Sequence, residues 1–493
     1  MTGTNNNNRI NEAVVIVGGG PSGASAAKAM ADRGYTNVQL YEAYPHPKTL
    51  SKTSSKAYVI ALSPRGQQGI LESTGIDVIK EASSQDSKLG IVSSHLARHV
   101  YNPRTKKISS KARPSTGYER AIATRQALTE HLLDAAQESG VTIHYQHRLV
   151  DIDFERKVAI FGNSEGSTIE ASYELLVASD GSRSKVRTLM VENQTTLADF
   201  SARIAEDSME YQVVVLPKNP FAETHPENTT HSWNNKELNS ICLGFPVKKE
   251  NSIGMLFAIV FPEGQLESFR KTGYETPLTK LLPDLFDGDE KAANLQEFES
   301  QLRANQIANG GLCVWSSSLG HAKSGIVLLG DSGHGMWPSL GQGANCALES
   351  VSVFVKCLDK LEDNDENWTS TLIQHYSTTR SADATAAVDL TYGGIGARES
   401  RGRMNTPLSS KLQMVGMMLL HKLTLGVVPM PALLRVLLGT KGLSYSTAKK
   451  FHFGYEKYIC LWGLAMFALL GIAATTALRG SVSISETVSG SEL

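Results

Sequence analysis

One glycine-rich segment has the residue types that bind a phosphate group, in the spacing G-x-G-x-x-G. It begins at Gly18, directly after the apolar run 14–17. Gly18 permits a tight turn, Gly20 lets a diphosphate approach the backbone, and Gly23 lets a following helix pack closely on the strand. A helix is expected from Ser22 to residue 33, so its N-terminal N–H groups would face the anion. The segment predicts a dinucleotide-binding turn; the alternative is a purely structural glycine turn.

An acidic residue further along extends this site. A second apolar run, 38–41, ends at Glu42, which follows Gly18 by 24 residues. A carboxylate at that distance can accept hydrogen bonds from the hydroxyls of a ribose. Because the same carboxylate would repel a 2′-phosphate, the sequence favours FAD or NAD over NADP as the bound dinucleotide.

Asp180 and Gly181 begin a second polar segment, Asp-Gly-Ser-Arg-Ser-Lys-Val-Arg, directly after a predicted buried strand at 173–178. A cofactor-binding role is one interpretation of this segment. The other is a strand-to-helix turn in which Asp180 or Ser182 caps the helix.

A third segment combines glycines with polar residues after the apolar run 325–330. A metal site at His334 is not indicated, because no second histidine stands at ligand spacing from it. A glycine-rich backbone that starts a helix, here expected at 341–360, offers free N–H groups to a flavin ring that becomes anionic on reduction. The candidate cofactor residues of this segment are Gly330, Asp331, Pro338, Gly341, Gly343 and Asn345.

These segments resemble, in type and order, those of the FAD-dependent aromatic hydroxylases, the group A flavoprotein monooxygenases. The resemblance runs over nearly the whole chain and implies that the segment at Asp180 contacts FAD and NADPH, that Asp331 contacts the ribityl chain, and that Arg125 contacts FAD. The alternative for Arg125 is a charge on a helix surface. By resemblance, NADPH reduces FAD, and a flavin hydroperoxide transfers one oxygen atom to an electron-rich ring.

Within this family the chain is similar to the kynurenine 3-monooxygenases, in the segments 60–66 and 231–233 and in the closing hydrophobic helix. The resemblance implies substrate contacts from Arg98, which would bind a carboxylate, and from Tyr118 and Tyr392.

Three positions depart from that pattern. The family's tyrosine partner falls on Ser115, its asparagine on Gly393, and a later tyrosine on Pro431. The expected substrate is therefore kynurenine-like or another small anionic aromatic. No catalytic acid, base or nucleophile is assigned.

Composition and length limit which other classes of protein the chain can belong to. The chain has 493 residues, more than one core usually supports, so two packed domains are expected. A net charge of -1 without a basic cluster gives no reason to propose a nucleic-acid partner. The five cysteines are odd in number and contain no C-x-x-C pair, so neither a disulfide framework nor a zinc site is indicated.

The periodicities predict an α/β fold with a discontinuous Rossmann-like FAD domain, an inserted sheet-rich substrate domain, C-terminal helices and one transmembrane helix. A helix is expected at 120–137, strands at 211–216, 241–245 and 253–261, and helices interrupted by prolines at 408–440. The expected boundaries are a disordered tail at 1–12, the FAD domain at 13–200 and 321–400, the substrate domain at 201–320, a helical region at 401–457, the membrane helix at 458–478 and a tail at 479–493.

The membrane helix is expected because 21 consecutive residues, Tyr458 to Leu478, carry no charge and are flanked by Lys457 and Arg479. As a helix this run would reach about 31 Å at ~1.5 Å per residue, enough to cross a bilayer core. The alternative is a buried C-terminal helix. A spanning helix this close to the C-terminus implies a tail anchor with the body facing the cytosol, and the resemblance favours the mitochondrial outer membrane over the endoplasmic reticulum.

Two other functions stay open. The same scaffold could epoxidise or reduce an apolar lipid that arrives from the bilayer along the Leu- and Met-rich stretch 412–438, whose alternative role is a helical lid or interface. A non-catalytic flavoprotein that serves as a membrane-bound interaction partner is the third possibility.

Overall fold

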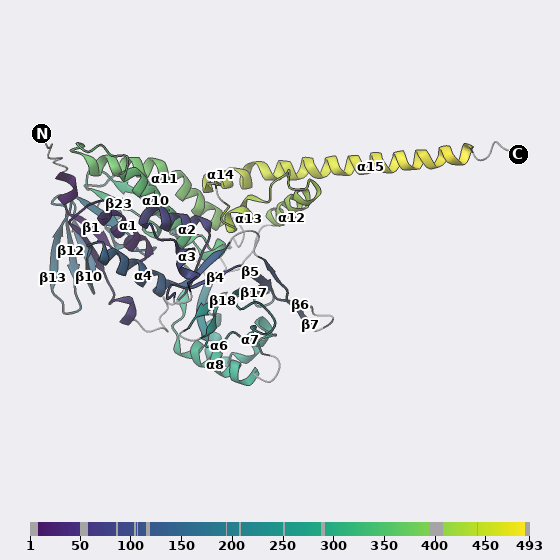
Figure 1. The fold of residues 1–493 in the computed structure, drawn as a ribbon, viewed down its shortest axis with the longest axis horizontal. Coiled ribbons are helices and arrows are strands. Elements are labelled where there is room, and N and C mark those ends of the chain that lie inside the picture. Colours follow the sequence, from purple (N-terminus) through teal and green to yellow (C-terminus); the bar gives the residue numbers. More distant parts are fainter. Residues whose placement is uncertain are drawn as a thin grey trace.

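A computed structural model gives the fold of the protein (Figure 1). It describes residues 8–49, 58–84, 87–102, 105, 107–114, 119–193, 195–206, 209–249, 252–286, 291–393, 408–440 and 442–488.

A six-stranded sheet, ordered β10-β2-β1-β14-β23-β22, forms the first half of the molecule. The strands from β10 to β23 are parallel, and β22 is antiparallel to β23. Strands β1, β14 and β23 are buried along their whole length, as expected for parallel strands that are covered on both faces. The strands are β1 (Val14–Val17), β2 (Val38–Glu42), β10 (Thr142–Tyr145), β14 (Leu175–Ala178), β22 (Gly320–His321) and β23 (Ile326–Leu328).

Different layers cover the two faces of this sheet. Val14 and Ile16 of β1 point into a core shared with helices, whereas Val15 and Val17 point into a second core shared with a three-stranded sheet. The helices are α1 (Pro21–Ala31), α2 (Pro64–Thr74), α4 (Arg125–Glu138), α10 (Gly343–Leu358) and α11 (Trp368–Gly393). The other layer consists of β11 (Arg148–Asp153), β12 (Val158–Gly162), β13 (Thr168–Ser172) and α5 (Lys185–Glu192).

A seven-stranded sheet, ordered β20-β16-β19-β18-β17-β5-β8, forms the second half. One face packs on helices α6 (Gln265–Thr272), α7 (Glu275–Leu281) and α8 (Lys291–Ala304). The strands predicted at 211–216, 241–245 and 253–261 are confirmed, within β16, β18 and β19. The members are β5 (His95–Arg98), β8 (Ala112–Pro114), β16 (Met209–Leu216), β17 (Thr229–Asn235), β18 (Ser240–Lys248), β19 (Ile253–Pro262) and β20 (Ala308–Asn309).

Short elements complete the two halves. Strands β3 (Val59–Leu62), β4 (Ile91–Ser93) and β9 (Arg120–Thr124) form one small sheet, and β6 (Val100–Asn102) pairs with β7 (Lys107–Ser109). Strand β15 (Ala202–Glu206) pairs with β21 (Leu312–Ser316). The remaining helical turns of this part are η1 (Asn8–Asn11), η2 (Pro47–Thr49), α3 (Val78–Ala82), α9 (Asp331–His334) and η3 (Pro338–Leu340).

Two expectations need correction. The helix predicted at 120–137 was wrong in its first turn, because β9 pairs there with β3 and β4. The helix starts only at Arg125, where the Thr124 hydroxyl caps it by accepting the N–H of Ala127 at 3.1 Å. The disordered tail predicted at 1–12 was too long, because η1 is ordered and Arg9 donates to the Glu362 carbonyl at 2.8 Å.

The C-terminal part is helical and ends in a long helix that projects from the body (Figure 1). Its elements are α12 (Leu408–Leu423), α13 (Ala432–Leu437), α14 (Tyr445–Lys450), one π-helical turn (Phe451–Tyr455) and α15 (Glu456–Val488). Among the described residues one helical stretch, Tyr445–Leu470, is long and apolar enough to cross a membrane, by length and composition; the mean hydropathy of its most apolar 18 residues is 1.2, and 12% of that window is buried. Pro429 and Pro431 lie between α12 and α13, as predicted.

Candidate cofactor site

The glycine turn lies between β1 and α1, where the sequence predicted it. Gly18 has a φ of +98°, a conformation that side chains rarely allow. A methyl group on Gly23 would collide with the Gly18 carbonyl, so this glycine is needed for close packing of helix on strand. The Ser179 hydroxyl, at the end of β14, donates towards the carbonyls of Val17 and Gly18 at 2.9 Å each, and so ties the turn to the neighbouring strand.

The N-terminus of α1 has the properties of an anion site. Its N-cap is Gly20, and no side chain caps its first N–H groups. Such groups, together with the helix dipole, attract a phosphate. Glu42 at the end of β2 accepts the N–H of Gly19 at 2.6 Å and that of Tyr44 at 2.9 Å, which holds its carboxylate beside the turn.

Arg125 is the first residue of α4 and reaches this turn. A Cβ built on Gly20 would lie 3.5 Å from Nη2 of Arg125, so the guanidinium lies beside the place where a diphosphate would approach. The backbone N–H of Arg125 donates to the Tyr58 carbonyl at 2.8 Å, and its Cζ lies 5.9 Å from the centre of the Tyr58 ring.

Asp331 is an enclosed carboxylate at the start of α9, shortly after β23. Its Oδ1 has no hydrogen-bond partner among the described residues. Burial raises the pKa of Asp331 to about 6, against the opposing charges of Arg125 and Arg187. An enclosed polar atom without a partner is costly, so this oxygen is well suited to accept a hydrogen bond from a ligand hydroxyl.

Arg187 joins two of the predicted segments, although it was not among the candidate site residues. It is 2% exposed, and it donates at 2.7 Å both to the Ser332 carbonyl and to the Ser182 carbonyl. Its position as the last residue of the segment that begins at Asp180 was the available signal. Arg187 is a positioning residue, because it holds the turn after β14 against the turn after β23.

Only one of the two carboxylate oxygens of Asp180 has a structural role. Its Oδ2 accepts the N–H groups of Lys185 at 2.7 Å and Val186 at 3.2 Å and thereby caps α5, while Oδ1 has no partner in the described part of the chain. Burial raises the pKa of Asp180. Gly181 follows with a φ of +86° and open space where a side chain would be.

The third segment brings α10 to the same edge of the sheet. Gly330 has a φ of +63°, and a Cβ there would lie 2.9 Å from the Ser22 hydroxyl, so the first and third segments touch. Pro338 begins η3, and Gly341, with a φ of +59°, faces open space. No side chain caps the N-terminus of α10, which starts at Gly343, so its N–H groups are free for a ligand.

The side chain of Asn345, by contrast, is fully occupied by protein. Its Oδ1 accepts the N–H of Ser63 at 2.8 Å, and its Nδ2 donates to the carbonyls of Ala61 at 3.2 Å and Gly341 at 3.0 Å. These bonds hold the loop before α10 on β3 and α2.

His334 is also internal. Its Nε2 lies 2.8 Å from the Ser350 hydroxyl, and burial lowers its pKa to about 3, so the imidazole is neutral. The part of the chain that the structure describes contains no group of three or more His, Cys, Asp or Glu that could hold a metal.

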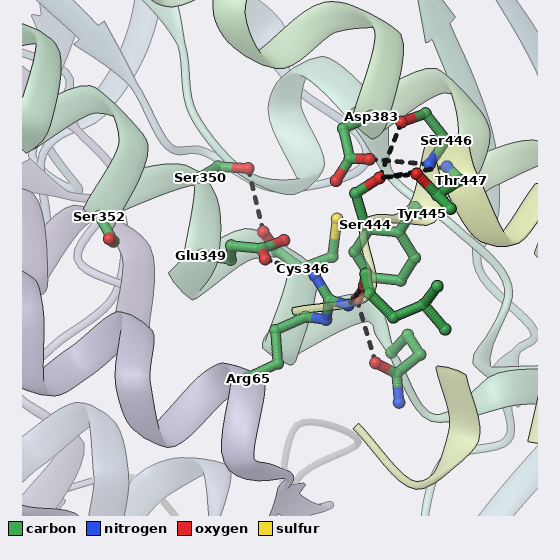
Figure 2. A network of polar contacts seen from close by, with 12 residues as sticks. Arg65, Cys346, Glu349, Ser350, Ser352, Asp383, Ser444, Tyr445, Ser446 and Thr447 are labelled. Atoms are coloured by element: carbon green, nitrogen blue, oxygen red, sulfur yellow. Dashed lines mark hydrogen bonds and ion pairs between the residues drawn. The ribbon is translucent and has the colours of Figure 1, made fainter. Parts of the chain in front are cut away.

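A second set of charges lies behind this loop; we call it the ion cluster (Arg65, Glu349, Arg380 and Asp383). Arg65 pairs with Glu349, and Arg380 pairs with Glu349 at 2.8 Å and with Asp383 at 3.1 Å. Figure 2 shows Arg65 and Glu349 beside Tyr445 of α14. The Tyr445 ring lies 4.1 Å from the Arg65 Cζ, and its hydroxyl donates to Gln342 Oε1 at 3.0 Å.

The predicted substrate residues lie in different places. Arg98 is exposed on β5, on the sheet face that also carries Tyr211 and Val213, as the strand registers show. Val213 belongs to an apolar cluster against which Tyr58, the neighbour of Arg125, packs. Burial raises the pKa of Tyr211 to about 12, with the charge of Arg125 opposing it. This face of the sheet is therefore turned towards the candidate cofactor site.

Tyr392 ends α11 in an aromatic cluster. Its ring centre lies 5.0 Å from that of Trp337 and 5.3 Å from that of Trp315, whose face is covered by Arg203 with Cζ at 3.9 Å. Trp337 is 3% exposed, and its indole N–H has no partner among the described residues. Nothing in the sequence pointed to Trp337. Tyr118 and Ser115 lie outside the described residues.

Taken together, the residues fit FAD. The glycine turn and Arg125 suit the diphosphate, Glu42 suits a ribose, and Asp331 has an oxygen free for the ribityl hydroxyls. The open N-terminus of α10 suits a reduced flavin ring.

Comparisons with known proteins support FAD as the cofactor. A family model described as an FAD binding domain matches residues 11–391. Among curated proteins, a kynurenine 3-monooxygenase of Neurospora crassa is 28% identical, over 76% of both chains. One of Legionella pneumophila is 26% identical, over 76% of this chain and 79% of its own.

Two solved structures share the fold. One is the tetrameric 2-methyl-3-hydroxypyridine-5-carboxylic acid oxygenase, with a TM-score of 0.57, 18% identity, and 77% of this chain and 90% of that chain covered. The other is P. aeruginosa PqsL in complex with 2-aminobenzoylacetate, with a TM-score of 0.57, 18% identity, and 80% and 98% covered. The chain therefore belongs to the FAD-binding-domain family and is an FAD-dependent monooxygenase.

Proposed function

We propose that the protein uses NADPH and molecular oxygen to hydroxylate the ring of a small anionic aromatic substrate, with L-kynurenine as the first to test. The observation that carries this proposal is the meeting of Arg125 and the unpaired carboxylate of Asp331 at the glycine turn, opposite a sheet face that carries Arg98. The names of the curated relatives support kynurenine as the substrate class.

Bound FAD would supply the redox chemistry, by accepting electrons from NADPH and passing one atom of O2 to the ring. The chain's own residues bind and orient. The Arg125 guanidinium and the N-terminus of α1 offset the charge of the diphosphate, Glu42 binds the ribose, and Asp331 accepts from the ribityl chain. The free N–H groups at the start of α10 stabilise negative charge on the reduced ring.

For the substrate we propose two contacts. Arg98, whose side chain is exposed on the sheet face turned towards the cofactor, binds the carboxylate. Tyr392 and Trp337 provide an aromatic wall, and the unpartnered indole N–H of Trp337 adds a hydrogen-bond donor. Tyr118 remains a predicted substrate contact. The proposed substrate domain is 201–320, inserted between the two parts of the FAD domain, 13–200 and 321–400.

The direct test measures NADPH oxidation by the detergent-purified protein with and without L-kynurenine, and follows the product by mass. We expect a stimulated rate and a product heavier by one oxygen atom. Arg98→Gln should raise KM for kynurenine with little change in FAD content, whereas Arg156→Gln, at an exposed turn between β11 and β12, should change neither. Bound FAD without any kynurenine response would refute the substrate assignment.

Oxidation of an apolar lipid is the second candidate, because α12 and α15 expose a large apolar surface next to the body. A rate that responds to apolar ligands but not to aromatic acids would favour it. No NADPH oxidation with any ligand would favour a non-catalytic flavoprotein.

We also propose that residues 458–478 of α15 cross a bilayer, as a tail anchor of the mitochondrial outer membrane with the body in the cytosol. Support comes from the exposure of apolar side chains along the described part of α15, among them Leu461, Trp462 and Leu469. Protease protection on isolated mitochondria and microsomes tests both the orientation and the compartment. The protein should be recovered with the mitochondria, and protease should cleave its body there without opening the organelle; recovery with the microsomes would contradict the compartment.

A further inference from the structure

Helix α12 has an apolar stripe that no described part of the protein covers. Its members are spaced at helical intervals and point away from the body, whereas Met417 and Leu420 on the opposite side are 1% exposed and pack on Cys460 of α15. The stripe consists of Leu408, Leu412, Val415, Leu419 and Leu423.

The turn that follows α12 exposes its apolar residues even more. Leu425 is 95% exposed and Val427 is 86% exposed. A pair of aliphatic side chains at the tip of a turn, continuous with an apolar stripe, is unusual for a surface in water. We call residues 424–428 the apex.

Helix α12 runs parallel to the first part of α15. Gln413 donates to the His452 carbonyl at 2.7 Å, Gly416 lies against Cys460, and a Cβ on Gly463 would lie 2.7 Å from Leu420. These contacts advance together along the two helices. Since α12 ends at Leu423, the apex lies about one turn beyond the level of Leu464, well inside the uncharged stretch of α15.

The backbone N–H groups of the apex are satisfied within the protein. The N–H groups of residues 424 to 426 donate to carbonyls in the last turn of α12, with Gly426 donating to His421 at 2.8 Å, and the N–H of Val427 donates to Thr424. The N–H of Val428 donates to the Thr424 hydroxyl at 3.0 Å, and its carbonyl lies 2.8 Å from Nδ1 of His421. Because these N–H groups already have partners in the protein, moving the turn out of water costs less than it would for a turn with free donors.

The charges around the apex suit a lipid surface. Between residues 408 and 479 the sequence has eight Lys or Arg and one acidic residue, Glu456, which is buried. Lys422, Lys450 and Lys457 are exposed. Such cations attract anionic headgroups, and the long side chain of Lys422 can reach the headgroups from a partly inserted helix.

We propose that α12 and the apex form a second membrane-inserting element, which lies beside α15 and places Leu425 and Val427 in the hydrocarbon of the leaflet next to the body. The proposal rests on the proposed crossing by α15, and it adds a second point of attachment. Two adjacent points fix how the body is turned and tilted on the membrane, which one helix alone does not.

The test places a fluorophore on single added cysteines in the full-length protein, in vesicles of phosphatidylcholine and phosphatidylserine. The five native cysteines are buried. Leu425→Cys reports on the apex, Met466→Cys on α15, and Leu71→Cys, on the exposed side of α2, on the body. Lipids with a doxyl group on the acyl chain quench a probe in hydrocarbon, and iodide quenches a probe in water.

We expect doxyl lipids to quench the probes at 425 and 466, and iodide to quench the probe at 71. Iodide quenching at 425 with doxyl quenching at 466 would overturn the second insertion and leave the crossing of α15 intact. Iodide quenching at 466 would refute the crossing itself. A probe at 425 that neither agent reaches would show that protein, such as a second copy, covers the apex, and would also overturn the proposal. Val427→Cys repeats the measurement independently.

Discussion

The candidate cofactor site and the ion cluster both border the loop before α10, and they differ in how their carboxylates are paired. In the ion cluster each carboxylate faces a guanidinium. At the cofactor site, Asp180 and Asp331 each keep one enclosed oxygen without a partner in the described chain. Other enclosed polar atoms of the described chain also lack a hydrogen-bond partner, Glu349 Oε2 among them, but that oxygen still forms an ion pair with Arg380. The two aspartates are therefore distinguished by having no ion pair among the described residues, which suits them to bind a ligand.

The largest expected effect is a loss of stability when a cation of the ion cluster is removed. Arg380→Met removes a buried guanidinium and leaves the partly buried Glu349 and Asp383 without their shared cation, while Glu349 keeps Arg65. We expect the apoprotein to lose about 3 kcal/mol of unfolding free energy. Denaturant unfolding followed by fluorescence measures it. Arg183→Met, which removes an exposed arginine 3.9 Å from Glu206, should cost about 0–1 kcal/mol. Similar losses in both variants would show that the ion cluster stabilises the fold no more than an exposed ion pair does.

Removing the Asp331 carboxylate should weaken FAD binding without destabilising the fold. We expect Asp331→Ala to weaken FAD binding about tenfold to a hundredfold, the equivalent of about 1.5–3 kcal/mol for a hydrogen bond to a charged group. The apoprotein should be as stable as the wild type or more so, because an unpaired enclosed charge is lost. Flavin fluorescence titration and unfolding measure the two quantities; Asp199→Ala, at an exposed aspartate, is the control.

A smaller effect, on the free energy of unfolding, should depend on pH. The pKa of Asp331 is raised to about 6 in the folded apoprotein from 3.8, so the folded state binds the extra proton between these values. The penalty of its charge is therefore absent near pH 4 and complete above about pH 6. Asp331→Asn should gain stability over the wild type as pH rises through that window. A stability difference that does not vary with pH between 4 and 7 would contradict the assignment.

The smallest expected effect tests the bond that joins the two regions. Tyr445→Phe keeps the ring over Arg65 but leaves Gln342 Oε1 without its donor, and we expect a loss of about 1 kcal/mol in unfolding free energy. A shift in the absorbance of bound flavin would show that the loop before α10 moves as well. Tyr101→Phe, at an exposed residue, should have no effect.

The sequence predicted those parts of the site that depend on the local backbone. Gly18, Gly23 and the helix after them follow from spacing, and the buried strands follow from uninterrupted apolar runs. The strand at 120–124 was missed because its Ala and Ile residues also suit a helix, and only pairing with β3 and β4 decides between them.

Contacts between distant segments could not be predicted in the same way. The bonds from Arg187 to Ser182 and Ser332 depend on β14 and β23 being neighbours, and the saturation of Asn345 depends on β3. The parallel course of α12 and α15 likewise comes from packing at Gly416 and Gly463, for which the sequence offered no periodic signal.

The order of strands in the central sheet has a consequence for synthesis on the ribosome. Ala178 of β14 pairs with Leu328 of β23, about 150 residues later in the chain. At roughly 5–20 residues per second, the ribosome completes β23 about 8–30 s after β14. During that time one edge of the sheet is open and half of the cofactor site is missing, so a nascent chain of this protein should need protection by chaperones and should acquire FAD only late in translation or after it.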